Sequence, residues 1–417
     1  MNFYIIGRTT EITASNIIER GINESIKTFS GSNAGVCYMS NCYFNESVSG
    51  EENAIKRFNH TMKSGHHSVA DHYNVTILME DIPKILAMIL NSTQTYATSE
   101  KSARYTVMEN LTEEESKIVD KWNTILGKVL INNHGLSEEN ATKIARENSR
   151  YFISIFSPAT TMSHTKTVRE WNYLYQWMNK LLNRMKKYNE QDGILHTFSK
   201  NMIPWVEKYC DWFQNSDIYI EDMIDPNDRF LEFLPQIEMG SLKNKMYTQS
   251  ILKDSYSVMY HASFAALAQL QRHRSIKYVI NDMSTLENPV FFVPEFIAKD
   301  DELVHEWRED MYSLRERIPQ GLVVEVAELG TIDKFLLKCN ERLCGRAQYE
   351  TMSLVRDMLD GFIKYGEFSH YYNEEIRKRY TPGVENIIMP KCAVRGTGCT
   401  DKGGCISGAN SALYRLF

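Results

Sequence analysis

Two short polar segments in different halves of the chain place the strongest constraint on its fold. Leu270-Gln271-Arg272-His273-Arg274 brings two permanent cations and one titratable ring into three residues. Guanidinium groups make bidentate, directional contacts with phosphate and carbonyl oxygens, so this cluster predicts an anionic partner. Glu100-Lys101-Ser102-Ala103-Arg104-Tyr105 offers an acceptor, a hydroxyl and another guanidinium on one short stretch. A single site that uses both segments requires a fold that brings the two halves together.

The composition predicts a globular protein with room for two or three domains. The chain has 417 residues, of which 43% are hydrophobic and 24% are charged, and its net charge is -6. This acidic balance argues against non-specific binding to nucleic acid, so we expect no nucleic-acid partner. The local cationic clusters stand out against that background.

The start of the chain and its cysteines predict a cytoplasmic protein. Residues 1–6 lack the basic segment and the long apolar run of a signal peptide, and no apolar stretch reaches the length that spans a membrane. Five cysteines are scattered and three crowd the tail: Cys37, Cys42, Cys210, Cys339 and Cys344, then Cys392, Cys399 and Cys405. We therefore expect reduced thiols and no membrane contact.

Hydrophobic periodicity predicts an α+β fold that is mostly helical. In the first half we expect a strand over 73–79 and helices over 51–65, 82–90, 111–133, 137–155 and 167–188. In the second half we expect helices over 257–271, 300–317, 331–345 and 347–364, followed by loop and tail from residue 381. The predicted linker is a Pro/Asp/Asn-rich break at 222–228.

A weak internal repeat connects the two halves. In the first half the segments are Ala145-Arg146-Glu147-Asn148-Ser149-Arg150 and Thr167-Val168-Arg169-Glu170. They parallel Arg315-Glu316-Arg317-Ile318-Pro319 and Asn340-Glu341-Arg342 in the second half. Sequence identity alone leaves a true repeat open.

The segment Gly65-His66-His67-Ser68-Val69-Ala70-Asp71-His72 resembles a signature of the flavin-dependent thymidylate synthases, the ThyX family. Cys37-Tyr38-Met39-Ser40 upstream and Glu100-x-Ser102-x-Arg104 downstream continue the resemblance, which covers most of 30–175 and resumes over 255–358. It implies two tandem ThyX-like units, 1–220 and 226–385, and a Cys/Gly-rich tail over 386–417.

Each motif also has a plainer interpretation. The histidines are consistent with surface polar residues, and they lack the His-Glu-x-x-His spacing of a helical zinc site. Arg272-His273-Arg274 alone fits a solvated turn, and Glu100-x-Ser102-x-Arg104 alone fits a solvated charged face.

The family signature is divided between the halves. The first half has Ser92-Thr93-Gln94 where the family has Arg-His-Arg, and Met178 where the family has a late arginine. The second half has Arg272-His273-Arg274, and it has Arg342 shortly before Ala347-Gln348-Tyr349-Glu350, which resembles the family's Ala-Gln-Trp-Glu. The second half in turn lacks Gly-His-x-Ser and Glu-x-Ser-x-Arg. We therefore expect composite sites.

The resemblance implies FAD-dependent reductive C5-methylation of dUMP to dTMP, with methylenetetrahydrofolate and NADPH as co-substrates. It implies three catalytic residues: Ser102, Arg342 and His66. It implies flavin contacts from His66, Ser68, Arg272, His273 and Arg274. It implies nucleotide contacts from Gln269, Glu100, Ser102, Arg104, Arg150, Arg315 and Arg342. Because ThyX sites lie at the interfaces of a homotetramer, the expected assembly is a homodimer that forms a pseudo-tetramer.

Two other functions and the role of the tail stay open. The altered segment after Arg274 leaves room for methylation or hydroxymethylation of another pyrimidine nucleotide, and a non-catalytic flavin or nucleotide binder is the other alternative. Cys392, Cys399 and Cys405 lie among glycines, where thiolates can bind zinc if a fourth ligand comes from elsewhere. A redox disulfide and inert thiols are the alternatives.

Overall fold

The chain forms two compact units that interleave along the sequence. The computed structural model describes residues 1–12, 17–36, 50–92, 96–190, 192–223, 254–280, 289–345, 347–366, 368 and 374. Unit 1 comprises Met1–Ala87, Thr95–Lys101 and Pro158–Glu232, and unit 2 comprises Met88–Gln94, Ser102–Ser157 and Phe233–Phe417. Unit 2 therefore includes a segment of the first half. The repeat boundaries 1–220 and 226–385 stay a prediction, because compact packing does not test sequence repetition.

Unit 1 is built on a four-stranded antiparallel sheet. The strand order is β1 (Asn2–Arg8), β4 (Asn74–Ile82), β6 (Thr160–Thr167) and β5 (Ala97–Glu100). Along β4 the side chains of Val75, Ile77 and Met79 are buried and alternate with more exposed ones, as a strand with one covered face requires. The covered face is the core of this unit.

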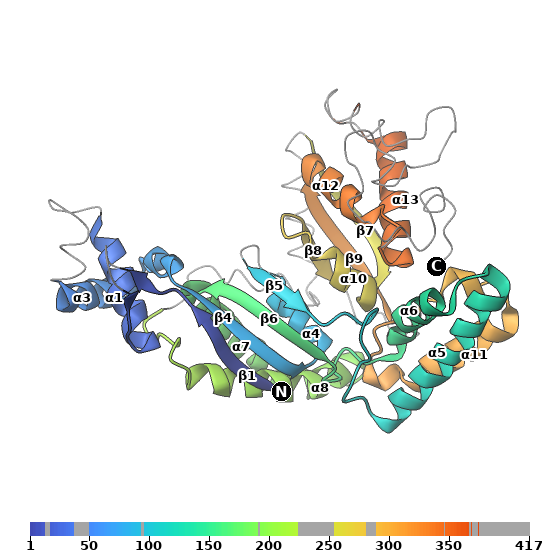
Figure 1. Ribbon diagram of the computed structural model, residues 1–417, viewed down its shortest axis with the longest axis horizontal. Helices are drawn as coiled ribbons and strands as arrows, with labels where there is room; N and C mark the ends of the chain where they lie inside the picture. The colour runs from blue at the N-terminus through green and yellow to red at the C-terminus, as the bar shows by residue number, and fades with distance from the viewer. Residues whose placement is uncertain are drawn as a thin grey trace. The chain divides into compact units, whose positions relative to one another are not determined.

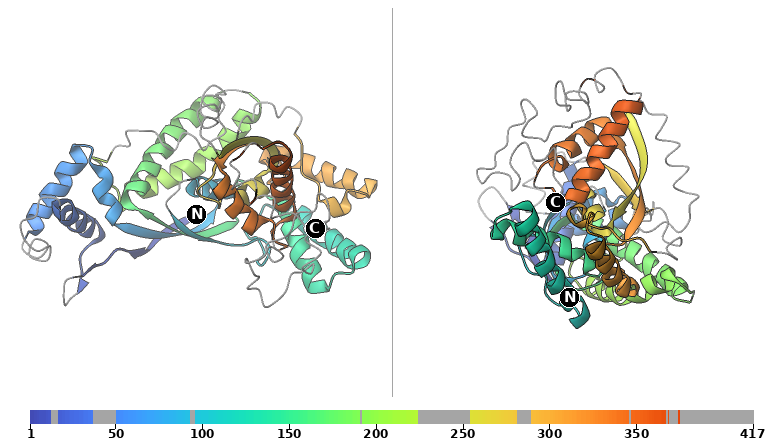
Figure 2. Two further views of the ribbon diagram at one scale, coloured as in Figure 1. Left: turned by 90° about the horizontal axis from the view of Figure 1, so that it is seen from above. Right: turned by 90° about the vertical axis from the view of Figure 1, so that its right-hand side faces the viewer.

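Two long helices cover that face. Figures 1 and 2 show α7 (Val168–Tyr188) and α8 (Ile194–Gln214) along one side of the sheet. Trp171 of α7 is fully buried and donates its indole N–H to the Val75 carbonyl at 3.1 Å. The Thr167 hydroxyl caps the start of α7 by accepting the Glu170 N–H. The end of β6 therefore also fixes where α7 begins.

The remaining elements of unit 1 carry the Gly-His-x-Ser segment. α1 (Ile22–Gly35) and α3 (Glu51–Lys63) pack closely, since a Cβ at Gly31 would lie only 1.9 Å from the Ala54 carbonyl oxygen. Beyond α3, Gly65 has a φ of +79°, which glycine adopts without strain, and the 3-10 helix η2 (His67–His72) follows. A short ladder pairs β2 (Glu11–Ile12) with β3 (Ile17–Ile18).

Unit 2 is built on a three-stranded antiparallel sheet in the order β7 (Ser255–Ser263), β9 (Val323–Thr331) and β8 (Lys277–Ile280). Helix α10 (Phe264–Leu270) begins directly after β7, where the Ser263 hydroxyl accepts the Ala266 N–H at 3.1 Å. Helix α12 (Ile332–Arg342) begins directly after β9, and α13 (Tyr349–Tyr365) packs against α10 and α12. Strand ends thus position both helices that carry candidate site residues.

Helices from both halves of the sequence pack together in unit 2. The first half supplies α5 (Glu113–His134), α6 (Glu138–Ser149) and the 3-10 helix η3 (Arg150–Phe152), and the second half supplies α11 (Asp301–Ser313) and η5 (Arg315–Arg317). The buried rings of Trp122 and Trp307 meet edge to face at 4.8 Å. Trp122 also donates its indole N–H to Asp310 at 2.8 Å. This packing holds the segment 102–157 inside unit 2.

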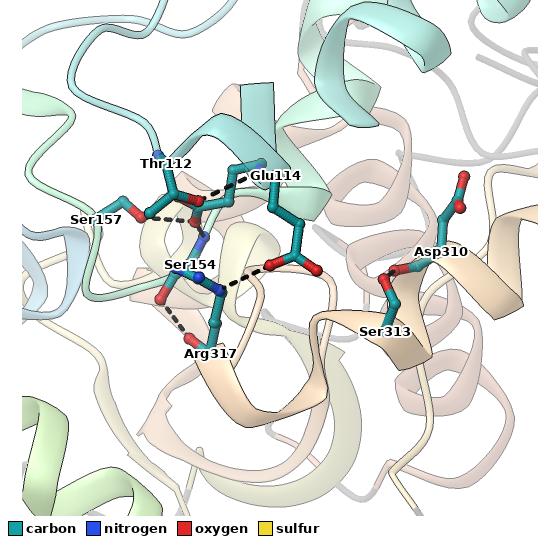
Figure 3. A network of polar contacts seen from close by, with 8 residues as sticks. Thr112, Glu114, Ser154, Ser157, Asp310, Ser313 and Arg317 are labelled. Carbon is teal, nitrogen blue, oxygen red and sulfur yellow. Dashed lines mark hydrogen bonds and ion pairs between the residues drawn. The ribbon is translucent and has the colours of Figure 1, made fainter. Parts of the chain in front are cut away.

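A polar network strengthens the same contact (Figure 3). The Glu115 carboxylate closes a capping box with Thr112, and its other oxygen accepts the Ser154 N–H at 2.8 Å and the Ser157 hydroxyl at 2.6 Å. The Ser154 hydroxyl donates to the Arg317 carbonyl, and Arg317 pairs with Glu114 at 3.3 Å. The chain is therefore fixed directly after η3, which carries Arg150.

The two sheets share an arrangement of strands. In β4-β6-β5 and in β7-β9-β8, the last strand along the chain lies in the middle. The strands β4 and β7 have 9 residues each, and the helices α4 (Lys84–Leu90) and α10 that follow them have 7 each. Asn74 pairs with Thr167, and Ser255 pairs with Thr331. The Val168 N–H at the start of α7 donates to the carbonyl of Tyr73, directly before β4, and the Ile332 N–H at the start of α12 donates to the carbonyl of Asp254, directly before β7, both at 2.9 Å.

The α+β, mostly helical fold is confirmed, and several element boundaries are corrected. The predicted helix over 257–271 is wrong, because residues up to Ser263 form β7 and only 264–270 are helical. The helix expected over 137–155 ends at Ser149. Sequence analysis also missed β6, β8 and β9. Most of the predicted linker and the whole cysteine tail lie outside the described residues.

Among the described residues, no helix combines the length and apolarity that crossing a membrane requires.

Candidate functional site

Three of the predicted site residues meet at the end of α10. Arg342, the last residue of α12, donates from Nη2 to the Gln269 carbonyl at 2.8 Å and from Nε to His273 Nε2 at 2.9 Å. These residues are 69 and 73 positions apart in sequence, and the paired strands β7 and β9 bring their helices together. These predicted site residues of the second half therefore lie together in space.

The contact with Arg342 defines the protonation of His273. An arginine side chain only donates, so His273 Nε2 carries a lone pair and the ring is neutral with its proton on Nδ1. Burial, then the charges of Arg342 and Lys338, lower the pKa of His273 to about 3. The ring thus stays uncharged at neutral pH and offers one N–H.

Gln348 brings an arginine of the first half to the same place. Its Oε1 accepts hydrogen bonds from Arg150 Nη2 and from Gln269 Nε2, the latter at 2.8 Å. Gln348 is 2% exposed, whereas Arg150 and Gln269 are half-buried. Arg150 and Arg342 come from different halves of the sequence and lie in one compact unit.

Neither Arg150 nor Arg342 has a carboxylate within ion-pair distance among the described residues. Each is half-buried, and burial and the charge of Arg272 lower the pKa of Arg342. A partly buried guanidinium without a counter-ion is costly to maintain, so the pair indicates a place for an anionic or carbonyl-bearing ligand. This is the main chemical feature of the site.

A buried hydrogen-bond network supports Gln348 from behind. Gln348 Nε2 donates to the hydroxyl of Tyr151, which donates to Glu350 at 2.7 Å. Glu350 also accepts the N–H and hydroxyl of Ser263 at 2.8 and 2.6 Å. Burial raises the pKa of Glu350, and the bonds from Ser263 and Tyr151 oppose that rise. The network joins η3, α10 and α13.

The other cations of the second half are more exposed. Arg272 and Arg274 lie beside His273 with exposed side chains, and Arg272 is close enough to influence the pKa of Arg342. Arg315 contacts Tyr312 instead: its Nη1 donates to the Tyr312 carbonyl at 3.0 Å, and its guanidinium lies 4.2 Å from the ring centre. The structure therefore gives Arg315 a local partner rather than a contact with Gln269 or Arg342.

The Glu-x-Ser-x-Arg segment is divided between the two units. Glu100 ends β5 in unit 1, and its buried carboxylate pairs with Lys84. Ser102 is exposed and belongs to unit 2. Arg104 is 7% exposed and forms a buried ion pair with Glu147, which raises the pKa of Arg104 against the effect of its burial. Glu100 and Arg104 thus already have charged partners.

The Gly-His-x-Ser residues lie in unit 1. His66 and Ser68 are exposed, whereas His67 is buried. His67 Nε2 is 3.0 Å from the Met62 carbonyl, so it donates there, and Nδ1 accepts the Tyr173 hydroxyl at 2.8 Å. His67 is therefore a packing residue, and the two exposed residues are the ones that a ligand could reach.

Sequence reasoning missed the three residues behind Gln348. Tyr151 and Glu350 are fully or nearly fully buried, and Ser263 was placed inside a helix. The available signal was the quoted Ala347-Gln348-Tyr349-Glu350 segment, whose amide and carboxyl were not assigned roles. No group of three His, Cys, Asp or Glu side chains suited to a metal occurs in the described part of the chain. The predicted Cys392, Cys399 and Cys405 site lies outside it.

The fold is α+β, and the end of α10 carries a cluster of half-buried and exposed cations. Residues 28–187 match the family model described as thymidylate synthase complementing protein, Thy1. This match confirms the resemblance to the flavin-dependent thymidylate synthases over residues 28–187 and supports thymidylate synthase-type activity in general. No curated protein matches the chain at a significant level.

Proposed function

We propose that this protein is an enzyme that methylates C5 of dUMP reductively, using FAD, methylenetetrahydrofolate and NADPH. The observation that carries the proposal is the pair of half-buried guanidinium groups, Arg150 and Arg342, that lack carboxylate partners among the described residues and flank Gln269. The Thy1 match over 28–187 supplies the reaction type. Together they favour a nucleotide over a neutral ligand.

The residues present fit a flavin in charge and hydrogen bonding. The exposed Arg272 and Arg274 can hold phosphates or ring carbonyls, and the neutral His273 offers an Nδ1–H to an acceptor. His66 and Ser68 are accessible in unit 1. FAD, when bound, supplies the redox chemistry, and the protein's part is to bind, orient and polarise.

Arg342 has the main catalytic role in this proposal. A cation placed at a pyrimidine carbonyl stabilises the negative charge that develops as C5 becomes nucleophilic. The Gln269 carbonyl and His273 Nε2 accept hydrogen bonds from two nitrogens of its guanidinium, so its position does not depend on the ligand. Ser102 is exposed and free to bind the nucleotide, whereas Arg104 would first have to leave Glu147.

We further propose that the two halves are diverged copies of one unit. The equal strand order, the equal lengths of β4 and β7 and of α4 and α10, and the matching pairs Asn74–Thr167 and Ser255–Thr331 support this. When Thr167 is matched with Thr331, the position of Arg342 in α12 corresponds to Met178 in α7, which is fully buried. The first copy would therefore lack its own late arginine, and a dimer of the chain would bind about two flavins where four single units have four sites.

The test is product analysis with the full-length protein. Purified protein should carry a flavin absorption band, and with dUMP, UMP and dCMP offered together, mass spectrometry should find a methyl group on dUMP alone. Turnover should require the folate and NADPH. If the protein bound no flavin and no nucleotide, the proposal would be overturned. If dCMP were methylated instead of dUMP, the proposed substrate would be dCMP.

A binding-only relative is the second candidate. Glu100 and Arg104, two of the expected nucleotide contacts, are both engaged in ion pairs with Lys84 and Glu147. Flavin and dUMP binding without substrate-dependent oxidation of the reduced flavin would favour this alternative.

A further inference from the structure

The segment 102–110 is accessible to solvent except at one buried arginine. The segment lies between β5 and α5 in sequence and belongs to unit 2. Most of its side chains are exposed, among them two large apolar ones, Tyr105 at 57% and Val107 at 62%. Arg104, at 7%, is its one buried side chain. The guanidinium of Arg104 therefore attaches an otherwise exposed segment to the interior of the unit.

The interior partner of Arg104 is Glu147 of α6, which is 4% exposed and accepts from Arg104 Nη2. Burial alone would lower the pKa of Arg104, but the Glu147 carboxylate outweighs that effect and the pKa is raised. Glu147 precedes Tyr151 by four residues; burial chiefly raises the pKa of Tyr151, and the charge of Glu147 adds to that rise. The ion pair therefore lies close to the buried network behind Gln348.

This arrangement leaves Arg104 almost no surface to offer to a ligand. Its guanidinium is buried, and its charge is already neutralised by a buried carboxylate. Carboxylate and phosphate oxygens make the same kind of charge-assisted hydrogen bond with arginine, so the two groups are alternative counter-ions. A phosphate placed next to the Glu147 carboxylate would also be repelled by it. Arg104 can bind a phosphate only if it leaves Glu147 and the segment 102–110 moves with it.

The end of the segment nearest α5 is suited to such a movement. Thr112 is held in its capping box with Glu115, so the start of α5 stays in place. Asn110, two residues earlier, has a φ of +58°, a left-handed conformation that asparagine adopts more readily than most residues. Rotation at Asn110 therefore allows Arg104 to leave Glu147 without disturbing α5.

We propose that Glu147 is a specificity-determining residue that competes with a ligand phosphate for Arg104, and that the segment 102–110 moves away from α6 when the phosphate takes its place. A ligand without a phosphate leaves the ion pair intact and gains nothing from Arg104. Glu147 thus favours phosphate-bearing ligands that can compensate for the lost pair, and it limits how tightly they bind. The inference rests on the proposed function in taking a nucleoside monophosphate as the ligand.

Glu147→Gln tests the competition in the full-length protein. The amide keeps the shape of the side chain but loses its charge, so a phosphate no longer has to replace a carboxylate at Arg104. dUMP should therefore bind at least about 10-fold more tightly than to the wild type, and deoxyuridine, which has no phosphate, should bind as before. Calorimetric titration measures both affinities. Glu207→Gln is the control for the loss of one negative charge, because its pair with Lys186 is exposed, and both affinities should stay at the wild-type values.

Further variants keep the test decisive. Adding Arg104→Gln to Glu147→Gln should abolish the gain, because the cation for which the phosphate competes is lost. If Glu147→Gln does not fold, Glu147→Asp replaces it: the carboxylate is retained on a side chain shorter by one methylene, and a smaller gain with dUMP is expected. In either unliganded variant, amide hydrogen exchange over 102–110 should be faster than in the wild type, because the attachment of the segment is weakened.

The outcomes separate this inference from the proposed function. If the wild type binds dUMP and the folded Glu147 variant binds it no more tightly, the competition is overturned alone. An equal gain with deoxyuridine would also overturn it, since the phosphate would not be responsible. If the wild type binds no dUMP, the inference is overturned together with the proposed function.

Discussion

Unit 1 and unit 2 contain sheets with the same strand order, and the side chains buried around the middle strands differ in charge. In unit 1, His164 of β6 stacks on Tyr96 at 4.8 Å and meets Trp171 edge on. At the same position of β9, Glu328 accepts hydrogen bonds from two tyrosines, Tyr256 at 2.6 Å and Tyr260 at 2.8 Å, and pairs with Lys338. The same three-strand arrangement thus surrounds His164 with aromatic rings in unit 1, where the buried cation Lys166 also lies over Tyr96, and places a buried carboxylate with its own cation in unit 2.

The helix after the middle strand differs in the same way. α7 presents Leu174 and Met178 to the core, both fully buried, where α12 presents Lys338 and Arg342. Glu328 neutralises Lys338, and Arg342 is left without a carboxylate among the described residues. The comparison teaches that Glu328, Lys338 and Arg342 are not required by this arrangement of three strands, since β4-β6-β5 forms with His164, Leu174 and Met178 at the matching positions.

The largest effect is expected when Lys338 of α12 is replaced by leucine, the residue that α7 carries at the matching position, Leu174. Lys338→Leu leaves the Glu328 carboxylate buried without its cation, and we expect a loss of about 3–5 kcal/mol in the free energy of unfolding. Denaturant titration measures it. Adding Glu328→Gln removes the stranded charge and should restore most of the stability. A free energy of unfolding for Lys338→Leu alone that lies within about 1 kcal/mol of the wild-type value would contradict this account.

Arg342→Met gives α12 the residue found in α7. Turnover should fall by about 10²–10³, because the cation that stabilises the developing charge is lost, while the fold persists as it does around Met178. Steady-state rates with dUMP measure this. Arg356→Met on α13 is the control: Arg356 bonds Ser353 and pairs locally with Asp357, so its loss should leave the rate unchanged. Equal rates for both variants would remove Arg342 from the mechanism.

Arg274→Ala tests whether the cationic segment after α10 binds the flavin. A charge-assisted contact contributes about 1.5–3 kcal/mol, so the affinity for flavin should fall by about 10- to 100-fold without loss of fold. Reconstitution of the apoprotein followed by absorbance gives the dissociation constant. Lys117→Ala, which breaks an exposed pair with Glu113 on α5, should leave flavin affinity intact. Unchanged affinity in Arg274→Ala would move the flavin elsewhere.

The smallest effect concerns pH and compares two buried tyrosine contacts. In unit 1 the Tyr173 hydroxyl meets His67, and in unit 2 the Tyr151 hydroxyl meets Glu350, whose pKa is raised by burial. A carboxyl with a raised pKa in the folded state contributes stability below its unfolded pKa, and that contribution is lost as the pH rises through the folded pKa. As the pH rises above the pKa of glutamate in the unfolded chain, the free energy of unfolding should therefore fall. It should fall more in the wild type than in Glu350→Gln. Parallel pH profiles would show that Glu350 titrates normally.

Local pattern predicted many of the elements of the first half of the chain. The helix over 51–65 corresponds to α3, which ends before Gly65, and the strand over 73–79 lies within β4. Helices over 111–133 and 167–188 correspond to α5 and α7. These elements carry strong periodicity or a clear capping residue, such as Thr112, and such signals are local.

The strand-to-helix junction at Ser263 could not be read in the same way. Tyr256, Val258 and Tyr260 alternate toward an alanine-rich apolar run, and a short apolar run does not distinguish strand from helix. The decisive contact is the pairing of β7 with β9, which is far along the chain. Tertiary pairing overrode local propensity there.

Sequence motifs predicted the site residues that belong to them, but they did not predict contacts between residues that are distant in the sequence. Gln269, His273 and Arg342 were singled out and lie together. Gln348 meets Arg150 across 198 positions, and no local pattern announces that contact. The prediction that Arg104 binds the nucleotide could not anticipate its ion pair with Glu147, because that pair depends on the packing of α6. The roles of all these residues in binding stay predictions.

The interleaving of the two units has a consequence for how the chain is made. Unit 2 needs residues 102–157, which leave the ribosome early, and residues beyond 233, which leave late. Until α11 emerges, Trp122 of α5 lacks the ring of Trp307, so an apolar surface waits uncovered during synthesis. Gene fragments divided near residue 220 would keep that surface exposed permanently. Such fragments should aggregate when expressed singly and gain solubility when co-expressed, which makes the halves of this chain obligate folding partners rather than separable modules.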